Sequence, residues 1–287
     1  MKNIKRTLNK TGIIALLLVL VLGVLTACGG GSDSGESGEE AADSGDKVIK
    51  VAASPTPHAE ILNSVADALA EEGWTLEVVE FDDYVQPNVA TTDGDVDANY
   101  FQHVPYLDQY NSENGTELVA VGNVHYEAMG AYKGTKDSFD ALEEGDQVGV
   151  PNDVTNEARA LQLLAANGVI KLKDGVGLEA TKTDIVDNPK GIEIVELEAA
   201  SIPGALPDLA VGVINANYAL GADLTVDDAI AYEAEDSEAA ETYVNVIVVN
   251  AGNENSEKTQ ALVKAVQTDA VKAFIEETYK GAVQAKF

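Results

Sequence analysis

The alternation of short β-rich stretches with helical patterns across residues 47–287 is the feature that most limits the possible folds. Residues 47–53 and 74–81 are predicted strands, and Gly73 is a predicted helix C-cap before the second one. Residues 57–72 form a predicted helix with one apolar face, made by Ile61, Leu62, Val65 and Leu69. Strands that alternate with helices favour α/β layers over an all-α or all-β fold.

The same alternation continues to the end of the chain. Further strands are predicted at residues 118–126, 147–150, 192–197, 209–214 and 243–249. Helices are predicted near residues 104–110 and 156–167, and as one continuous helix over residues 256–279. In that last helix four apolar residues recur at four-residue spacing: Leu262, Val266, Ala270 and Phe274. The length permits one large domain or two lobes with separate cores.

The first 27 residues are typical of an exported protein. Four basic residues precede an uncharged apolar run over residues 13–27, which is the layout of a secretory signal. A membrane-spanning helix, the alternative, needs about 20 apolar residues, and this run is shorter. The run ends in Leu25-Thr26-Ala27-Cys28, which resembles the lipobox of bacterial lipoproteins. The resemblance implies cleavage before Cys28 and a lipid on that cysteine.

Residues 28–46 are predicted to be a flexible, acidic linker behind this lipid. The stretch from Gly29 contains six acids, no base and no aromatic or β-branched residue, so it cannot bury enough apolar surface to fold. Cys28 is the only cysteine, which excludes a disulfide within the chain. Removal of residues 1–27 would leave 14 bases against 49 acids, a net charge of −35. Such a charge disfavours nucleic acid and anionic membrane as partners.

Arg159 is the only arginine that would remain after the signal is removed, beside 13 lysines. A guanidinium is a planar fork that can hold a carboxylate with two hydrogen bonds, which suggests a ligand contact. The alternative is an ordinary surface ion pair with Glu157 or another acid. The residue pattern alone does not decide between them.

A second candidate site is a local concentration of aromatic and polar residues. It comprises Asp82-Asp83-Tyr84 and residues 100–108, in a chain that is only 6% aromatic. Such rings can line an apolar pocket, and a thioether sulfur contacts ring edges favourably. A hydrophobic core cluster explains the same residues equally well.

Metal and enzyme sites are weakly indicated. The three histidines, His58, His103 and His125, are far apart and form no His-x-x-x-His pair, so we expect no metal ligands and no cofactor. No nucleophile elbow or phosphate loop occurs, and we expect no catalytic residues. A metal-uptake protein, a hydrolase that uses His103, and a surface adhesin remain alternatives.

The chain resembles the NlpA-type methionine-binding lipoprotein family of ABC importers. The resemblance rests on segments in the same order along nearly the whole folded part: residues 81–88, 97–103, 105–108, 150–153, 170–175, 194–199, 213–215 and 243–245. It implies a periplasmic-binding-protein-like fold of two α/β lobes, joined by crossover strands around a ligand cleft. The first lobe would comprise residues 47–130 and 246–287, and the second residues 131–245.

The resemblance also implies a binding site and partners. Arg159 would bind the ligand carboxylate, and Asn215 and Asn245 would hydrogen-bond its polar groups. The side-chain pocket would contain Tyr84, Phe101 and His103, and also Tyr126, where the family commonly has an aliphatic residue. The ligand would be L-methionine, with D-methionine, a methionine-containing dipeptide or another apolar amino acid as alternatives. The partners would be an ABC permease with its ATPase subunit, and the membrane through the lipid on Cys28.

Three segments depart from the family pattern. Val154 and Gly204 replace a common proline and a common arginine, and residues 239–242 differ from the usual Ser-Pro. The identity of the ligand is therefore less firmly implied than the family.

Overall fold

The computed structural model describes residues 47–233 and 238–287. The predicted signal segment, the acidic linker and Cys28 lie outside the described residues. Among the helices that are described, none is long and apolar enough to cross a membrane.

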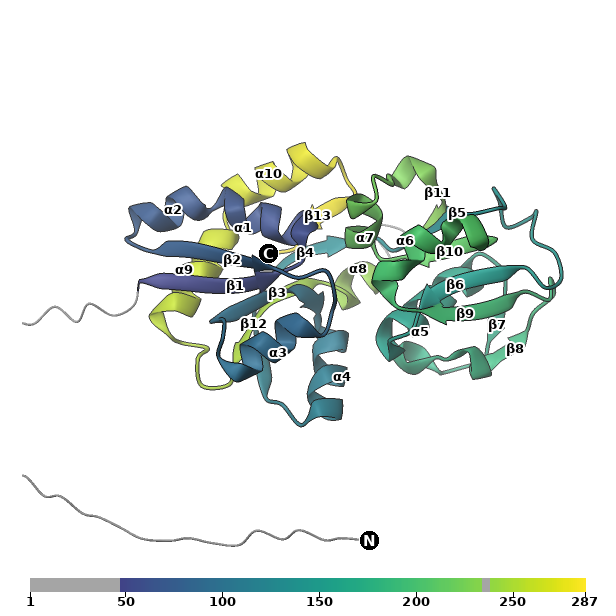
Figure 1. The fold of residues 1–287 in the computed structure, drawn as a ribbon, viewed down its shortest axis with the longest axis horizontal. Coiled ribbons are helices and arrows are strands. Elements are labelled where there is room, and N and C mark those ends of the chain that lie inside the picture. The colour runs from purple at the N-terminus through teal and green to yellow at the C-terminus, as the bar shows by residue number, and fades with distance from the viewer. Residues whose placement is uncertain (1–46, 234–237) are drawn as a thin grey trace, which may run out of the picture. The chain divides into compact units, whose positions relative to one another are not determined.

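A six-stranded mixed sheet organises the first lobe (Figure 1). Its order is β13-β4-β12-β3-β1-β2; β1 pairs in parallel with β2 and β3, whereas β12 and β13 pair antiparallel. The strands are β1 (Val48–Ala53), β2 (Thr75–Glu80), β3 (Ala98–His103), β4 (Leu118–Glu127), β12 (Asn245–Asn250) and β13 (Val283–Ala285). The helical segments of this lobe are η1 (Pro55–Ala59), α1 (Glu60–Ser64), α2 (Ala66–Glu71), α3 (Gln86–Asp93), α4 (Val104–Asn114), α9 (Glu257–Val266) and α10 (Asp269–Tyr279).

A five-stranded sheet organises the second lobe. Its order is β11-β5-β10-β6-β9, with β6 parallel to β9 and β10, and β5 antiparallel to β10 and β11. The strands are β5 (Gly130–Lys133), β6 (Gln147–Pro151), β9 (Glu193–Leu197), β10 (Val211–Ile214) and β11 (Ala229–Tyr232). The helices are α5 (Val154–Ala166), α6 (Ile202–Ala205) and α7 (Ala216–Gly221), and a small hairpin is formed by β7 (Lys171–Leu172) and β8 (Ile185–Asp187). Short 3-10 turns complete it: η2 (Gly177–Glu179), η3 (Lys182–Asp184), η4 (Ala199–Ser201), η5 (Leu206–Asp208) and η6 (Val226–Asp228). Helix α8 (Glu238–Thr242) precedes β12 and contacts β4 of the first sheet.

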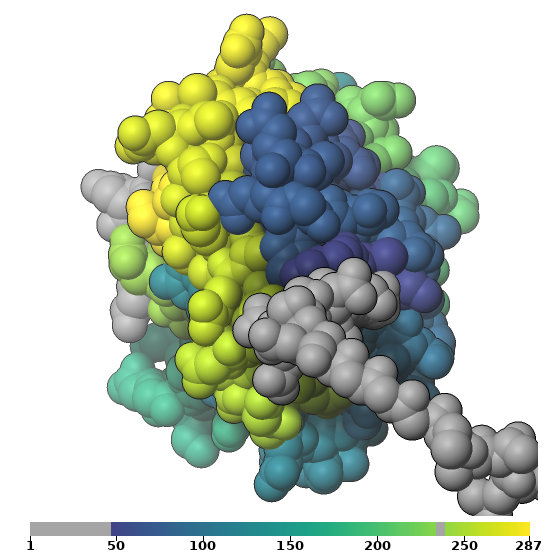
Figure 2. All heavy atoms as spheres, turned by 90° about the vertical axis from the view of Figure 1, so that its left-hand side faces the viewer, coloured from purple at the N-terminus to yellow at the C-terminus, as the bar shows by residue number. Residues whose placement is uncertain are grey.

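The chain passes between the two sheets twice. It leaves the first sheet after Glu127, enters the second at Gly130, and returns to the first at Asn245. The final helices α9 and α10 then pack beside α2 and α1, so the C-terminal segment completes the first lobe (Figure 2). The exact division into residues 47–130 with 246–287 and residues 131–245 stays a prediction.

Each lobe has its own apolar core, as the predicted strand–helix alternation requires. The predicted apolar face of residues 57–72 is buried against the first sheet, and Gly73 closes it with a positive φ of 86°. The segment is not one regular helix, because α1 ends at Ser64 and α2 begins at Ala66. In the second lobe α5 buries Leu161 and Leu164 against β6 and β10.

The single helix predicted over residues 256–279 is wrong. Thr268 accepts a hydrogen bond from the N–H of Val271 and so begins a new helix, α10, two residues after α9 ends. The break changes the helical phase. Leu262 and Val266 are buried as expected, but Ala270 is exposed, and α10 buries Val271 and Ile275 instead.

We expect Leu164→Ala to lower the free energy of unfolding by about 2 to 5 kcal/mol, because Leu164 is fully buried and its truncation leaves a cavity. Urea unfolding followed by circular dichroism measures this change. The matched control is Leu178→Ala, at a residue that is 40% exposed. An equal loss of stability in both variants would contradict this account of the second core.

Candidate functional site

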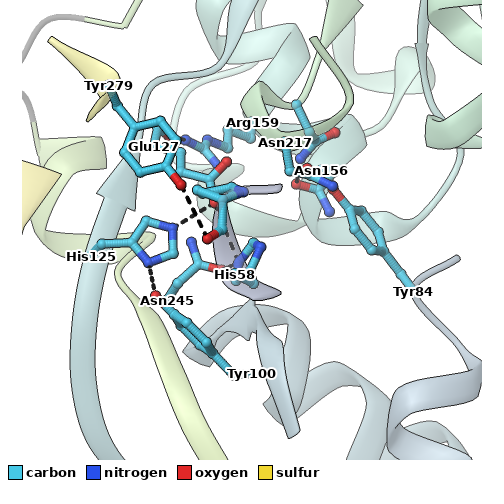
Figure 3. Close-up of polar contacts among 12 residues, drawn as sticks. His58, Tyr84, Tyr100, His125, Glu127, Asn156, Arg159, Asn217, Asn245 and Tyr279 are labelled. Carbon is cyan, nitrogen blue, oxygen red and sulfur yellow. Dashed lines mark hydrogen bonds and ion pairs between the residues drawn. The ribbon is translucent and has the colours of Figure 1, made fainter. Parts of the chain in front are cut away.

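A narrow cavity of about 20 Å³ lies between the two lobes. In this conformation that is room for about one water molecule. Its lining side chains are mostly polar or aromatic and come from both sheets and their helices (Figure 3). They are His58, Tyr84, Phe101, Gln102, His103, Tyr106, Glu127, Asn156, Arg159, Asn215, Ala216, Asn217 and Asn245.

His103 ends β3 and caps α4, which fixes its ring at the cavity wall. Its Nδ1 accepts a hydrogen bond from the N–H of Tyr106 at 3.2 Å, so the proton of the neutral ring is on Nε2. Nε2 lies 3.3 Å from Oδ1 of Asn156, across the cleft. Burial and the charge of Arg159 lower the pKa of His103 to about 3. His103 therefore acts as a neutral hydrogen-bond donor.

The start of α5 places Asn156 and Arg159 on the cavity. Asp153 caps the helix by accepting from the N–H of Asn156 at 3.0 Å, and it also binds the side-chain amide of Asn156. Oδ1 of Asn156 accepts a second hydrogen bond from Nδ2 of Asn215 at 2.7 Å. The cap residue thus orients the asparagine that joins His103 to Asn215.

Arg159 is 4% exposed, and its fork holds an acid of the protein itself. Nε and Nη2 donate to the two carboxylate oxygens of Glu233 at 2.7 and 2.6 Å, and Nη2 also donates to the carbonyl of Glu127. Burial alone would lower the pKa of Arg159, but Glu233 raises it above its ordinary value. The same carboxylate accepts from the hydroxyl of Tyr126 and the N–H of Met129, each at 2.8 Å.

This ion pair changes the expected role of Arg159. The bidentate edge expected to grip a ligand carboxylate is occupied by Glu233, in an ion pair that is buried and not on the surface as the alternative had it. The acid is not Glu157, whose carboxylate accepts from the N–H of Lys182. Arg159 nevertheless lines the cavity, and its hydrogen bonds to other described residues use only Nε and Nη2. Nη1 is the group that a ligand could engage.

Tyr126 was expected in the side-chain pocket but does not line this cavity. Successive side chains of a strand point to opposite faces. Because the side chain of Glu127 points into the cavity, that of its neighbour Tyr126 points away from it. Tyr126 instead lies behind the site, with its ring 5.8 Å from the guanidinium of Arg159 and its hydroxyl on Glu233. Its position makes it a support of the ion pair.

Three rings form an aromatic wall on the first-lobe side of the cavity. The ring centroids of Tyr84, Phe101 and Tyr106 lie 5.9 to 6.0 Å apart. The hydroxyl of Tyr84 donates to Oδ1 of Asn217 at 2.6 Å, which joins the wall to α7 across the cleft. The core explanation for this cluster does not fit Tyr84 and Phe101, because both line the cavity.

Asn215 presents an unsatisfied acceptor. Its Nδ2 donates to Asn156, whereas its Oδ1 is buried without a hydrogen-bond partner among the described residues. A buried carbonyl oxygen without a donor costs about 1 to 3 kcal/mol. A ligand that supplies an N–H would remove that cost.

Two of the three histidines meet at a buried carboxylate, which sequence spacing did not reveal. Oε1 of Glu127 lies 2.6 Å from Nε2 of His125 and 3.3 Å from Nε2 of His58. The hydroxyl of Tyr100 contacts Nδ1 of His125, and Nε2 of His58 is 3.0 Å from Oδ1 of Asn245. Burial lowers the pKa of His58 to about 4, against the opposing charge of Glu127, and lowers that of His125 to about 3.

These three residues are also a group whose ligand atoms, all within 4.8 Å of one another, could hold a metal ion. The hydrogen bonds argue against it. Nε2 of His58 faces two oxygen acceptors, Oδ1 of Asn245 and Oε1 of Glu127, so it carries a proton rather than a lone pair. The geometry fits a hydrogen-bonded network better than a metal centre.

The structure thus brings together six of the seven residues expected to bind ligand: Tyr84, Phe101, His103, Arg159, Asn215 and Asn245. Their roles in binding stay predictions. Sequence reasoning missed Glu127 and Glu233, because two acids among 49 carry no distinguishing signal. Asn156 could have been suspected, since it begins the predicted helix that carries Arg159.

Two sheets between which the chain passes twice, with a polar and aromatic cavity between them, define the two-lobed fold of periplasmic substrate-binding proteins. A family model described as NlpA lipoprotein matches residues 49–287. The chain belongs to this lipoprotein family.

Several known proteins are similar over most of the chain. The D-methionine-binding lipoprotein MetQ of Escherichia coli is 45% identical over 222 residues, which cover 76% of this chain and 80% of that protein. The crystal structure of a putative lipoprotein from Ruminococcus gnavus is 58% identical, with a TM-score of 0.83, and covers 84% of this chain and 100% of its own. A nutrient-binding protein from Burkholderia cenocepacia, solved bound to methionine, is 43% identical, with a TM-score of 0.79 and coverages of 83% and 100%.

We expect Glu233→Gln to lower the free energy of unfolding by roughly 3 to 5 kcal/mol, because it leaves the buried guanidinium of Arg159 without its counter-ion. The measurement is chemical unfolding at neutral pH. Glu72→Gln is the matched control, since Glu72 pairs with Lys264 at 2.6 Å on the surface and should cost less than about 1 kcal/mol. A Glu233 variant as stable as this control would show that the pair is dispensable.

Proposed function

We propose that this protein captures L-methionine outside the cytoplasm and delivers it to an ABC permease, whose ATPase subunit drives transport. The protein is a lipoprotein at the extracytoplasmic face of the membrane, as membership of its family requires. Relatives of this chain are named as methionine-binding proteins, and one solved relative contains methionine. These relatives are substrate-binding transport proteins rather than enzymes.

The observation that carries the proposal is the pairing of polar and aromatic groups around one cavity. Oδ1 of Asn215 awaits a donor, as an ammonium would supply, and Arg159 and His103 offer N–H groups to a carboxylate. The rings of Tyr84, Phe101 and Tyr106 suit an unbranched thioether. A zwitterion needs both kinds of polar partner, because its desolvation otherwise costs several kcal/mol.

Capture would work by differential affinity for the closed form. The cavity walls come from both lobes, so a ligand in it contacts both at once. Such a ligand stabilises the closed conformation only by the difference between its binding free energy in the closed form and that in the open form. The closed protein would then dock on the permease, and no bond of the ligand would be broken.

Isothermal titration calorimetry should give L-methionine a dissociation constant below about 10 μM, which corresponds to about −7 kcal/mol. D-Methionine, glycyl-methionine and L-leucine complete the panel and decide among the alternative ligands.

Asn215→Ala should weaken L-methionine binding at least about tenfold, because a lost hydrogen bond to a charged group costs roughly 1.5 to 3 kcal/mol. Asn255→Ala, at an exposed asparagine outside the cavity, is the matched control. No heat of binding with any of the four ligands would refute the proposed function.

Cys28 is the residue on which we propose the lipid is carried. The wild-type protein should incorporate labelled palmitate when expressed with lipoprotein-processing enzymes, and Cys28→Ser should incorporate none, because no other cysteine is present. Label that persisted in the variant would place the lipid elsewhere.

A further inference from the structure

We propose that Glu127, with His58 beside it, forms an ammonium subsite that makes a free, protonated amine a condition for tight binding. The inference rests on the proposed function and goes beyond it, because it assigns the recognition of one ligand group to residues without an expected role. The ligand class is a primary ammonium next to a carboxylate, as in an α-amino acid.

The first argument is position. Glu127 is the last residue of β4, where the chain leaves the first sheet, and its side chain is 6% exposed and lines the cavity. Figure 3 shows its carboxylate between the rings of His58 and His125. Asn215, with its unsatisfied buried oxygen, lines the same cavity. An ammonium has three N–H donors and can use several such acceptors together.

The second argument is charge. Among the residues that line the cavity, Arg159 has the only permanent positive charge, and its bidentate edge already pairs with Glu233. His58 and His125 are neutral near pH 7, because their pKa values are lowered to about 4 and about 3. The carboxylate of Glu127 therefore has hydrogen-bond donors but no dedicated cation. A buried charge of this kind is costly unless a counter-ion is supplied, and a ligand ammonium supplies it.

The third argument is orientation. One proton arrangement satisfies the network: Tyr100 O–H donates to Nδ1 of His125, and Nε2–H of His125 donates to Oε1 of Glu127. Nε2–H of His58 is shared between Asn245 and the same oxygen. Burial raises the pKa of Glu127, whereas the hydrogen bonds it accepts and the charge of Arg159 favour its ionised form. Tyr100 and His125 are therefore positioning residues, which hold the carboxylate toward the cavity.

The subsite predicts a selectivity that shape alone would not give. The 2-hydroxy acid analogue of L-methionine has the same thioether and carboxylate, but a hydroxyl replaces the ammonium. N-Acetyl-L-methionine keeps the nitrogen but loses its charge. Both should bind far more weakly than L-methionine, because neither provides a cation for Glu127.

The test is calorimetry of L-methionine and its 2-hydroxy analogue with the wild-type protein and with Glu127→Gln. The wild type should prefer L-methionine by about 100-fold, because the analogue removes one partner of a buried charge pair. Glu127→Gln should lose about that factor for L-methionine and change little for the analogue. Glu71→Gln, at an exposed acid on α2, is the matched control and should leave both affinities unchanged.

The possible results separate the two proposals. A wild type that binds neither compound would refute the proposed function itself. Equal affinities of the wild type for both compounds, or an equal loss of both in Glu127→Gln, would overturn the subsite alone. The wild-type comparison still decides if the variant fails to fold. Stoichiometric Zn²⁺ binding by the wild type that is lost in Glu127→Gln, with L-methionine affinity unchanged, would overturn the subsite in favour of a metal site.

Discussion

The buried ion pair between Arg159 and Glu233 is the constraint on which the arrangement of the site depends. It joins the start of α5 to the residue that follows β11, and its members also bind the carbonyl of Glu127 and the N–H of Met129. The ion pair therefore restrains the backbone of residues 127–129, where the chain crosses from the first sheet to the second. Removing one partner of such a pair is far more costly than the net stabilisation of the pair itself, because it leaves a buried charge. The backbone from which the Glu127 side chain projects is thus fixed by this pair.

Sequence patterns predicted the fold where hydrophobic periodicity was long and uninterrupted. The strands around residues 47–53 and 118–126 and the helix near residues 156–167 lie within about two residues of their predicted bounds. Strand β3 was missed, because it is buried on both faces and has no polar–apolar alternation. Its Asn99 and Gln102 bind one another and Asn88 of α3, a buried amide network that only tertiary structure makes favourable.

The candidate site was predictable to the extent that rare residues mark it. Arg159 stood out because it is the only arginine of the folded part, and Phe101 and His103 lie in a concentration of aromatic residues. The acids did not stand out. Glu127 and Glu233 differ from the other acids only in being buried beside a histidine pair and an arginine, which are neighbours brought together by the fold. Family resemblance likewise placed Tyr126 in the pocket, whereas strand alternation turns it away.

Hydrogen bonds between the lobes explain how a small ligand can control their closure. Tyr84 donates to Asn217 at 2.6 Å, and Tyr218 donates to the carbonyl of Asp82 at 3.0 Å, each from one side of the cleft to the other. Such bonds between neutral groups contribute only about 0.5 to 1.5 kcal/mol each, since water replaces them when the cleft opens. They set the geometry of the closed form without locking it. Charged groups therefore contribute more to the free energy of closing than these neutral bonds do, because water solvates such groups well and the closed cavity does not. A ligand that pairs with those charged groups determines whether the open or the closed form is populated.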